Sequence, residues 1–256
     1  MPLDPHMRRI LEAIPESAGM DVAHLPLAEA LARLRTPPVP PGAGDIFVPT
    51  RDMTIDGPHG EIPIRIYRPA AATGVLVHYH GGGWVLGSIA HDEAYCQALA
   101  HHAQCVVVSV DYRLAPEFRY PVPLDDSYRA LEWVLDNVAG LAGGGAPVAV
   151  GGTSAGANLA AAVALRALDR GRPQLAFQLL VYPVVDRSCR MPSYDEFATG
   201  HFLSADAMRW FWKQYAGDAP AADPWLSPLD APSLRGLPAA LVITAECDPL
   251  RDEGEA

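Results

Sequence analysis

The stretch Gly152-Thr153-Ser154-Ala155-Gly156 decides the fold. It follows the apolar run Val148-Ala149-Val150 and opens a helical pattern that continues to Arg170. A Gly-x-Ser-x-Gly sequence between a strand and a helix is typical of a nucleophile elbow, a sharp turn that projects a serine hydroxyl above the sheet. The glycines are needed because their neighbours would collide with a side chain. Ser154 is therefore the candidate nucleophile, and the helix behind it favours developing negative charge.

Outward from this turn, strand and helix patterns alternate. Five short apolar runs are typical of strands that are buried on both faces: Val75 to Tyr79, Cys105 to Val110, Val148 to Gly151, Leu175 to Tyr182 and Ala239 to Thr244. Helical patterns lie between them: Asp92 to His102, Pro123 to Asn137 and Ala155 to Arg170. Two further strands, Met53 to Asp56 and Ile62 to Tyr67, are expected to pair antiparallel at one sheet edge. The alternation predicts an α/β fold with a mostly parallel central sheet flanked by helices.

Two segments stand outside this alternation. Apolar residues recur at helical spacing in the first 35 residues, and the proline-rich stretch 37–42 then breaks the pattern. Residues 1–45 are thus expected to form N-terminal cap helices and a linker, and residues 46–256 the main domain. Within that domain, residues 186–233 contain no clear core strand but an aromatic helical face. That face belongs either to an ordinary packed helix or to a lid over a pocket, since long insertions are usually functional.

A glycine-rich turn, His80-Gly81-Gly82-Gly83-Trp84, directly follows the strand pattern 75–79. Three glycines leave backbone N–H groups uncovered, and acyl transfer needs such donors because its tetrahedral intermediate concentrates charge on one oxygen. This turn is the known oxyanion partner of an elbow serine. His80 precedes the glycines at a strand end, so we expect it to hold the loop and not to act as a base.

An acidic segment follows the last strand pattern. Glu246, Asp248 and Asp252 all come shortly after Thr244. A carboxylate at the carboxyl end of this strand lies at the same sheet edge as the elbow, where it could orient a catalytic imidazole. Geometry favours one of the first two acids.

Composition narrows the range of partners. Half of the 256 residues are hydrophobic, 19% are charged and the net charge is −11, which is typical of a folded globular protein. Such a surface repels phosphate backbones and anionic lipids, so we expect no nucleic-acid partner. We find no signal peptide, no apolar stretch long enough to span a bilayer and no Cys-x-x-Cys pair, and we expect a cytoplasmic protein with no metal site.

Four motifs in order carry a resemblance: those at 80–84 and 152–156, Asp-Tyr-Arg-Leu-Ala-Pro-Glu at 111–117, and Asp-Pro-Leu-Arg-Asp-Glu-Gly at 248–254. The chain resembles the hormone-sensitive-lipase-like, or bacterial family IV, carboxylesterases from about residue 45 to its end. The resemblance implies an α/β-hydrolase fold with a two-part helical cap. Thr153 stands where many members carry Asp, which indicates a branch with the sequence GTSAG, and Ala157 stands where a further glycine is common.

The same resemblance implies roles for single residues. Ser154 would be the nucleophile, Asp248 the triad acid, and the N–H groups of Gly82, Gly83 and Ala155 the oxyanion hole. We expect an apolar substrate pocket lined by Trp84, Phe202, Leu203 and Phe211. The expected reaction is hydrolysis of a small carboxylic ester with a short to medium acyl chain, without metal or organic cofactor. Whether the protein forms a homodimer stays open.

The catalytic histidine poses a problem. In this fold the triad order is serine, acid, histidine, but all nine histidines precede Asp248 and the chain ends at Ala256. We therefore expect that a C-terminal strand and helix are missing and that the 256 residues alone are nearly inactive, unless another histidine such as His201 substitutes. A truncated chain or a decayed gene would explain this. The alternative is a non-catalytic small-molecule-binding protein on the same fold, as in plant gibberellin receptors, although such a protein has no need of Ser154.

Overall fold

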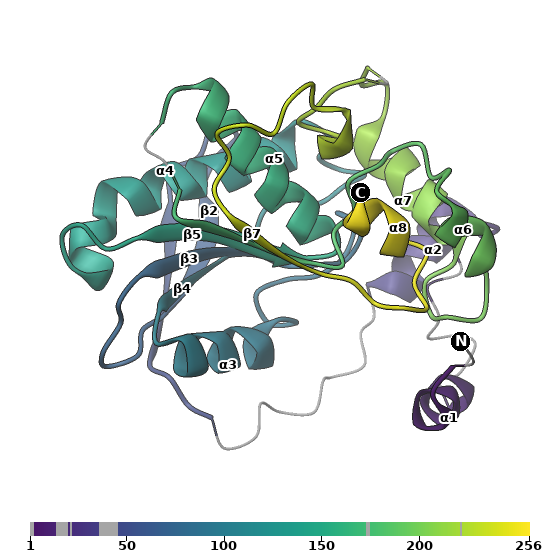
Figure 1. The fold of residues 1–256 in the computed structure, drawn as a ribbon, viewed down its shortest axis with the longest axis horizontal. Helices are drawn as coiled ribbons and strands as arrows, with labels where there is room; N and C mark the ends of the chain where they lie inside the picture. Colours follow the sequence, from purple (N-terminus) through teal and green to yellow (C-terminus); the bar gives the residue numbers. More distant parts are fainter. Residues whose placement is uncertain (1–2, 14–19, 21, 36–45, 173–174, 221) are drawn as a thin grey trace.

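The computed structural model describes residues 3–13, 20, 22–35, 46–172, 175–220 and 222–256 (Figure 1). The predicted linker at 37–42 lies outside these ranges. In the described part of the chain, seven strands form one sheet in the order β1-β2-β4-β3-β5-β6-β7. The strands are β1 Thr50–Ile55, β2 Ile62–Tyr67, β3 Val75–Tyr79, β4 Val106–Val110, β5 Val148–Thr153, β6 Phe177–Val181 and β7 Ala240–Ile243.

Strand directions match the prediction. The strands from β4 to β7 in the sheet order pair in parallel, whereas β2 pairs antiparallel with both β1 and β4. All residues of β3 and β4 are buried, because helices cover both faces of the central sheet. The predicted antiparallel pair at one edge and the parallel centre are both confirmed.

Helices cover the two faces of the sheet. Helix α3 (Glu93–Ala103) lies on one face, and helices α4 (Val122–Ala142) and α5 (Ala155–Asp169) lie on the other (Figure 1). Nearly every residue of α5 is buried, and its many alanines let the helix approach β5 closely. Because α5 starts directly behind β5, its amino end stands at the carboxyl edge of the sheet.

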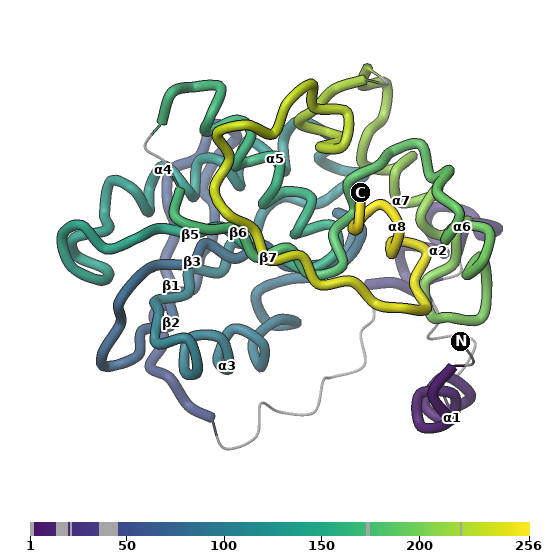
Figure 2. Tube along the Cα trace, in the orientation of Figure 1, coloured from purple at the N-terminus to yellow at the C-terminus, as the bar shows by residue number. Residues whose placement is uncertain are grey.

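The remaining helices are α1 Pro5–Ala13, α2 Leu27–Leu34, α6 Pro192–Glu196, α7 Ala205–Ala216, the short 3₁₀ helix η2 Pro228–Asp230 and α8 Arg251–Glu255. Helices α2, α6, α7 and α8 gather at one end of the molecule (Figure 2). As expected, the described residues between 186 and 233 contain no strand. Ser204 begins α7, its hydroxyl accepting a hydrogen bond of 3.0 Å from the N–H of Ala207.

An arginine joins the N-terminal segment to the core. The Arg35 guanidinium, just after α2, donates to the carbonyl oxygens of Val85 and Ala115 at 3.2 and 3.0 Å and forms a bidentate ion pair with Glu117. Val85 directly follows the glycine-rich turn, so this contact places α2 beside the candidate site.

The last strand in the sheet order has a distinct surface. All four residues of β7 are exposed, including the large apolar side chains of Leu241 and Ile243.

None of the described helices combines the length and apolar character that crossing a bilayer demands.

Candidate active site

Ser154 occupies a strained turn between β5 and α5. Its φ and ψ angles are 54° and −119°, in the left-handed half of backbone space that non-glycine residues rarely adopt. The N–H of Ser154 donates to the carbonyl oxygen of Val181 on β6 at 2.9 Å, which helps to hold this conformation. Backbone strain of this kind persists only where the surroundings impose it, and it clusters at functional sites. The predicted elbow geometry is present.

The two elbow glycines allow close packing. A Cβ atom on Gly156 would collide with the carbonyl oxygens of Tyr79 and His80, and one on Gly152 would lie 2.6 Å from the oxygen of Tyr79. The end of β3 therefore passes directly against the elbow. A side chain at either glycine would push the glycine-rich turn away from Ser154.

The glycine-rich turn lies against Ser154. A Cβ atom on Gly81 would be 3.6 Å from the Cβ atom of Ser154, so the two backbones are neighbours. Gly82 and Gly83 have φ angles of 116° and 57°. Among the described residues, the N–H groups of Gly82, Gly83 and Ala155 donate no hydrogen bond, and Ala155 opens α5 directly behind Ser154. Free N–H groups beside a serine are what a developing oxyanion requires.

His80 supports this turn from below. Its Nδ1 atom lies 2.8 Å from the carbonyl oxygen of Gly81, and its ring stacks on Tyr112 with the centroids 4.2 Å apart. The hydroxyl of Tyr112 donates to the carbonyl oxygen of His80 at 2.7 Å. Burial lowers the pKa of the His80 imidazole and so favours its neutral form. The placement agrees with the predicted role of holding the loop.

Trp84, predicted to line a substrate pocket, is fully buried beside helix α7. Its side chain has no exposed surface, and its ring lies 4.3 Å from Tyr215 and 4.4 Å from Trp212, centroid to centroid. The positive φ angle of Trp84, 60°, turns the indole away from the turn and into helix α7. Trp84 therefore joins helix α7 to the glycine-rich turn, and its substrate contact stays a prediction.

Phe211 packs on the glycine-rich turn beside Ser154. The Phe211 side chain is 1% exposed because its ring packs on Gly83, where a Cβ atom would collide with it. Phe202 is 50% exposed and has a φ angle of 71°, and Leu203 is partly buried. Of the predicted pocket residues, Phe211 touches the glycine-rich turn, and the ligand contacts predicted for Phe202 and Leu203 stay predictions.

The three acids that follow β7 have different surroundings. Asp252 is held by Arg251 at 2.8 Å and by the N–H of Ser193 at 2.8 Å, and the bond to Arg251 lowers its pKa. Glu246 is exposed. Asp248 is half-buried, accepts a hydrogen bond of 2.9 Å from the N–H of Leu250, and has a pKa raised by burial. Asp248 is therefore the acid with a free carboxylate oxygen to offer a partner.

No histidine contacts Ser154 or Asp248 by a hydrogen bond within the ranges that the structure describes. The Nδ1 atom of His201 is 2.9 Å from the carbonyl oxygen of Thr199, and its ring packs edge-on against Phe197. His201 is thus held inside a cap loop. In the same ranges, no group of three His, Cys, Asp or Glu side chains is placed to hold a metal ion.

Sequence reasoning missed two polar anchors of the site. The Asn158 amide donates to the carbonyl oxygens of Val184 and Leu226 at 2.9 and 3.0 Å, which ties α5 to the 186–233 segment. Glu253, inside the acidic motif, accepts hydrogen bonds from the N–H of Val185 at 2.9 Å and the hydroxyl of Tyr194 at 3.0 Å. A polar residue on the otherwise apolar face of α5 could have revealed Asn158, but no sequence signal distinguishes Glu253 from its acidic neighbours.

Comparison with known proteins agrees with this geometry. Residues 76–256 match a family described as having the alpha/beta hydrolase fold. The chain belongs to this family. The crystal structure of a hyperthermophilic esterase from Pyrobaculum calidifontis superimposes with a TM-score of 0.86 at 39% sequence identity, covering 100% of this chain and 83% of the esterase. The predicted fold is confirmed.

Two curated relatives are both ester hydrolases of Mycobacterium tuberculosis. Carboxylic ester hydrolase LipN is 44% identical over 82% of this chain and 58% of its own length. Carboxylesterase NlhH is 40% identical over 98% of this chain and 80% of its own length. The predicted resemblance to carboxylesterases is therefore confirmed, and the chain belongs to a family of ester-hydrolysing enzymes. It spans only part of the length of each of these two relatives.

Proposed function

We propose that the protein hydrolyses carboxylic esters with short to medium acyl chains through an acyl-enzyme on Ser154. The observation that carries this proposal is the position of Ser154. It is held at a φ angle of 54° beside the N–H groups of Gly82, Gly83 and Ala155, which donate no hydrogen bond among the described residues. A serine that only stabilised the fold would need neither the backbone strain nor the free donors.

The reaction follows from these groups. The Ser154 hydroxyl attacks the ester carbonyl carbon, and the carbonyl oxygen becomes an oxyanion that accepts hydrogen bonds from the three N–H groups. The amino end of α5 adds a favourable dipole for this charge. The tetrahedral intermediate expels the alcohol, and water then releases the acid from the acyl-enzyme.

Asp248 is proposed as the acid that orients the catalytic imidazole. Its carboxylate follows β7 at the same sheet edge as the elbow and, among the described residues, accepts a hydrogen bond from Leu250 alone. A histidine between Asp248 and Ser154 would accept the serine proton and pass it to the leaving alcohol. Because no described histidine is bonded to either residue, we expect the 256 residues alone to hydrolyse esters slowly.

The cap supports the proposed acyl preference. Phe211 on α7 packs directly on Gly83 of the glycine-rich turn, and Phe202, just before this helix, exposes apolar surface. An apolar cap packed on the turn favours small acyl groups over long chains. We propose that residues 1–45 and 186–233 together form this cap, since Arg35 ties the first segment to Val85 beside the turn.

A fluorophosphonate probe tests the proposal, because it forms a covalent adduct only with an activated serine. We expect mass spectrometry of the digested protein to locate an adduct on Ser154 that forms slowly, over hours, because no described histidine is bonded to this serine. The Ser154→Ala variant should give no adduct, and Ser233→Ala, which alters an exposed loop serine, should label like the parent.

Hydrolysis of p-nitrophenyl butyrate should follow the same pattern across these proteins. The proposal fails if labelling is absent under conditions in which the ester binds. Saturable binding of intact ester without an adduct would instead assign the non-catalytic binding role.

A further inference from the structure

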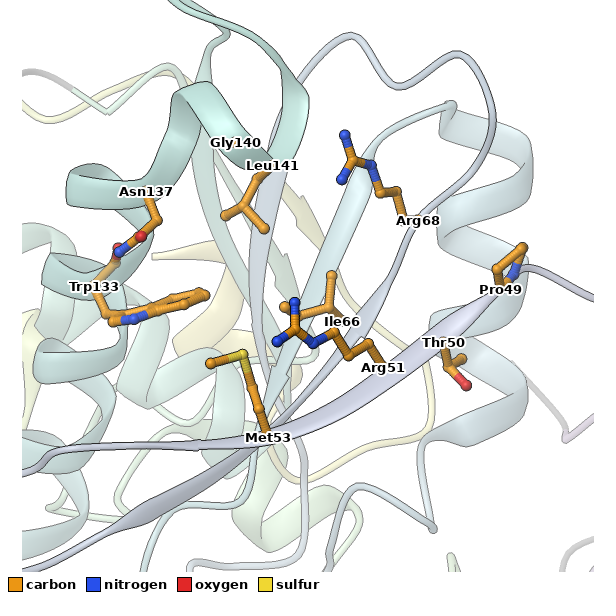
Figure 3. A pocket seen from close by; sticks show the side chains of 10 residues that line it. All are labelled: Pro49, Thr50, Arg51, Met53, Ile66, Arg68, Trp133, Asn137, Gly140 and Leu141. Carbon is orange, nitrogen blue, oxygen red and sulfur yellow. The ribbon is translucent and has the colours of Figure 1, made fainter.

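A groove far from Ser154 lies between strands β1 and β2 and the end of helix α4 (Figure 3). Its volume is about 470 Å³. The residues that matter here are Arg51, Met53, Ile66, Arg68, Trp133 and Leu141. Arg68 follows the end of β2 that pairs with the start of β4, so the groove opens near the amino ends of the parallel strands. Ser154 stands at the opposite edge, after the carboxyl end of β5.

Two arginines line this groove without side-chain partners among the described residues. Arg51 pairs with Ile66 across the sheet, and the N–H of Arg68 donates to Pro49, so Arg51 and Arg68 are diagonal neighbours on one face. Both are exposed, and neither side chain forms an ion pair or a hydrogen bond with any residue that the structure describes. Arg65 on strand β2, by contrast, forms ion pairs of 2.6 Å with two acidic side chains.

This pair of like charges is unusual in its setting. The whole chain carries a net charge of −11, so acidic partners are abundant, yet these two guanidiniums have none among the described residues. Neighbouring like charges on one strand face repel each other. A carboxylate between them would relieve that repulsion through charge-assisted hydrogen bonds, for which arginine has a matching planar geometry.

The rest of the groove is apolar. Figure 3 shows the Trp133 indole and the Met53 side chain directed toward each other across the floor, with Leu141 above them. Ile66 and Leu141 are each only 7% exposed, and Trp133 and Met53 are partly buried. An inorganic anion would leave this apolar surface in contact with water, whereas a ligand with an apolar body would cover it.

We infer that this groove binds an amphipathic carboxylate, such as a medium-chain fatty acid. Its carboxylate bridges the guanidiniums of Arg51 and Arg68, and its hydrocarbon chain lies along Trp133 and Met53. The ligand belongs to the chemical class of acid that ester hydrolysis releases. Binding at the groove does not depend on the proposed activity, because the site shares no residue with the elbow.

Sodium octanoate is the probe for this inference. The ¹H–¹⁵N spectrum of the intact 256-residue protein contains one indole signal for each tryptophan, and the signal lost in Trp133→Phe identifies Trp133. We expect octanoate to shift this signal saturably. The double variant Arg51→Gln/Arg68→Gln should weaken the binding about tenfold or more, because it removes both charge-assisted contacts. Added salt should weaken binding to the parent protein as well.

Two controls complete the test. Arg235→Gln alters an exposed arginine that precedes β7 at the other sheet edge, and it should bind octanoate like the parent. Octan-1-ol, which lacks the charge, should not shift the Trp133 signal at equal concentration. The inference is overturned if octanoate leaves that signal unmoved, or if the double variant, folded by its circular dichroism spectrum, binds as tightly as the parent.

Discussion

The buried carboxyl of Glu253 should make the protein less stable as the pH rises. Its side chain is 1% exposed, and burial raises its pKa from an ordinary value of 4.5 to about 8. The nearby charge of Asp186 raises the pKa further, whereas the hydrogen bonds from Val185 and Tyr194 oppose the shift. At neutral pH the folded protein therefore holds a proton on Glu253 that the unfolded chain has lost.

The sign and size of the effect follow from this difference. Below about pH 4.5 both states are protonated, and above about pH 8 both are ionised, so stability falls only between these values. Each pH unit in that window costs up to about 1.4 kcal/mol. From pH 5 to pH 8 the contribution of Glu253 to the free energy of unfolding should thus fall by about 3.5 kcal/mol, because the slope flattens near each of the two pKa values.

The perturbation is Glu253→Gln, which keeps an oxygen to accept the Val185 hydrogen bond but cannot ionise. Urea unfolding followed by tryptophan fluorescence at pH 5, 6, 7 and 8 gives the free energy of unfolding of both proteins. Other groups titrate equally in both, so the difference isolates Glu253. We expect the variant to gain stability over the parent steadily with pH. Glu255→Gln, on an exposed residue of the same helix, should follow the parent curve. A difference that stays within about 0.5 kcal/mol across the range would refute the reasoning.

Three further substitutions test the packing of the elbow and of helices α4 and α5. Gly156→Ala should cost about 2 kcal/mol or more in urea unfolding, because its Cβ atom would meet backbone at the end of β3, and an unchanged midpoint would contradict this. Gly140→Ala should gain about 0.5–1 kcal/mol by thermal unfolding, since a Cβ atom in this helical position meets nothing within 4 Å, and a lower melting temperature would disprove it. Asn158→Ala should cost about 1–3 kcal/mol by leaving the buried carbonyl groups of Val184 and Leu226 unpaired. Faster amide exchange in α5 would accompany that loss, and unchanged exchange would argue against it.

Strands and helices of the core could be predicted because their signals are local. The apolar runs 62–67 and 75–79 match β2 and β3 at both ends, since turn residues flank each run. The helix predicted over Pro123 to Asn137 continues to Ala142, because Gly140 alone does not end it. Gly143, with a φ angle of 98°, ends it.

Only part of the candidate site could be predicted from the sequence. The elbow and the glycine-rich turn need particular backbone angles, so their glycines are visible in the letters themselves. The burial of Trp84 against α7 cannot be predicted in this way, because the direction of its side chain depends on a positive φ angle that the sequence does not display. Glu253 escaped notice for a related reason. Its burial depends on Val185 and Tyr194, more than fifty residues earlier in the chain.

The contact between Phe211 and Gly83 has a consequence for attempts to alter substrate preference. Shortening Phe211 is the obvious step toward a wider acyl site, yet the same ring packs on Gly83, whose N–H is the proposed oxyanion donor. A smaller side chain would therefore admit bulkier acids while loosening the donor that speeds the chemistry. Selectivity and turnover are linked at this one residue, so variants chosen for a broader range of acids should need a compensating change elsewhere on α7 to recover speed.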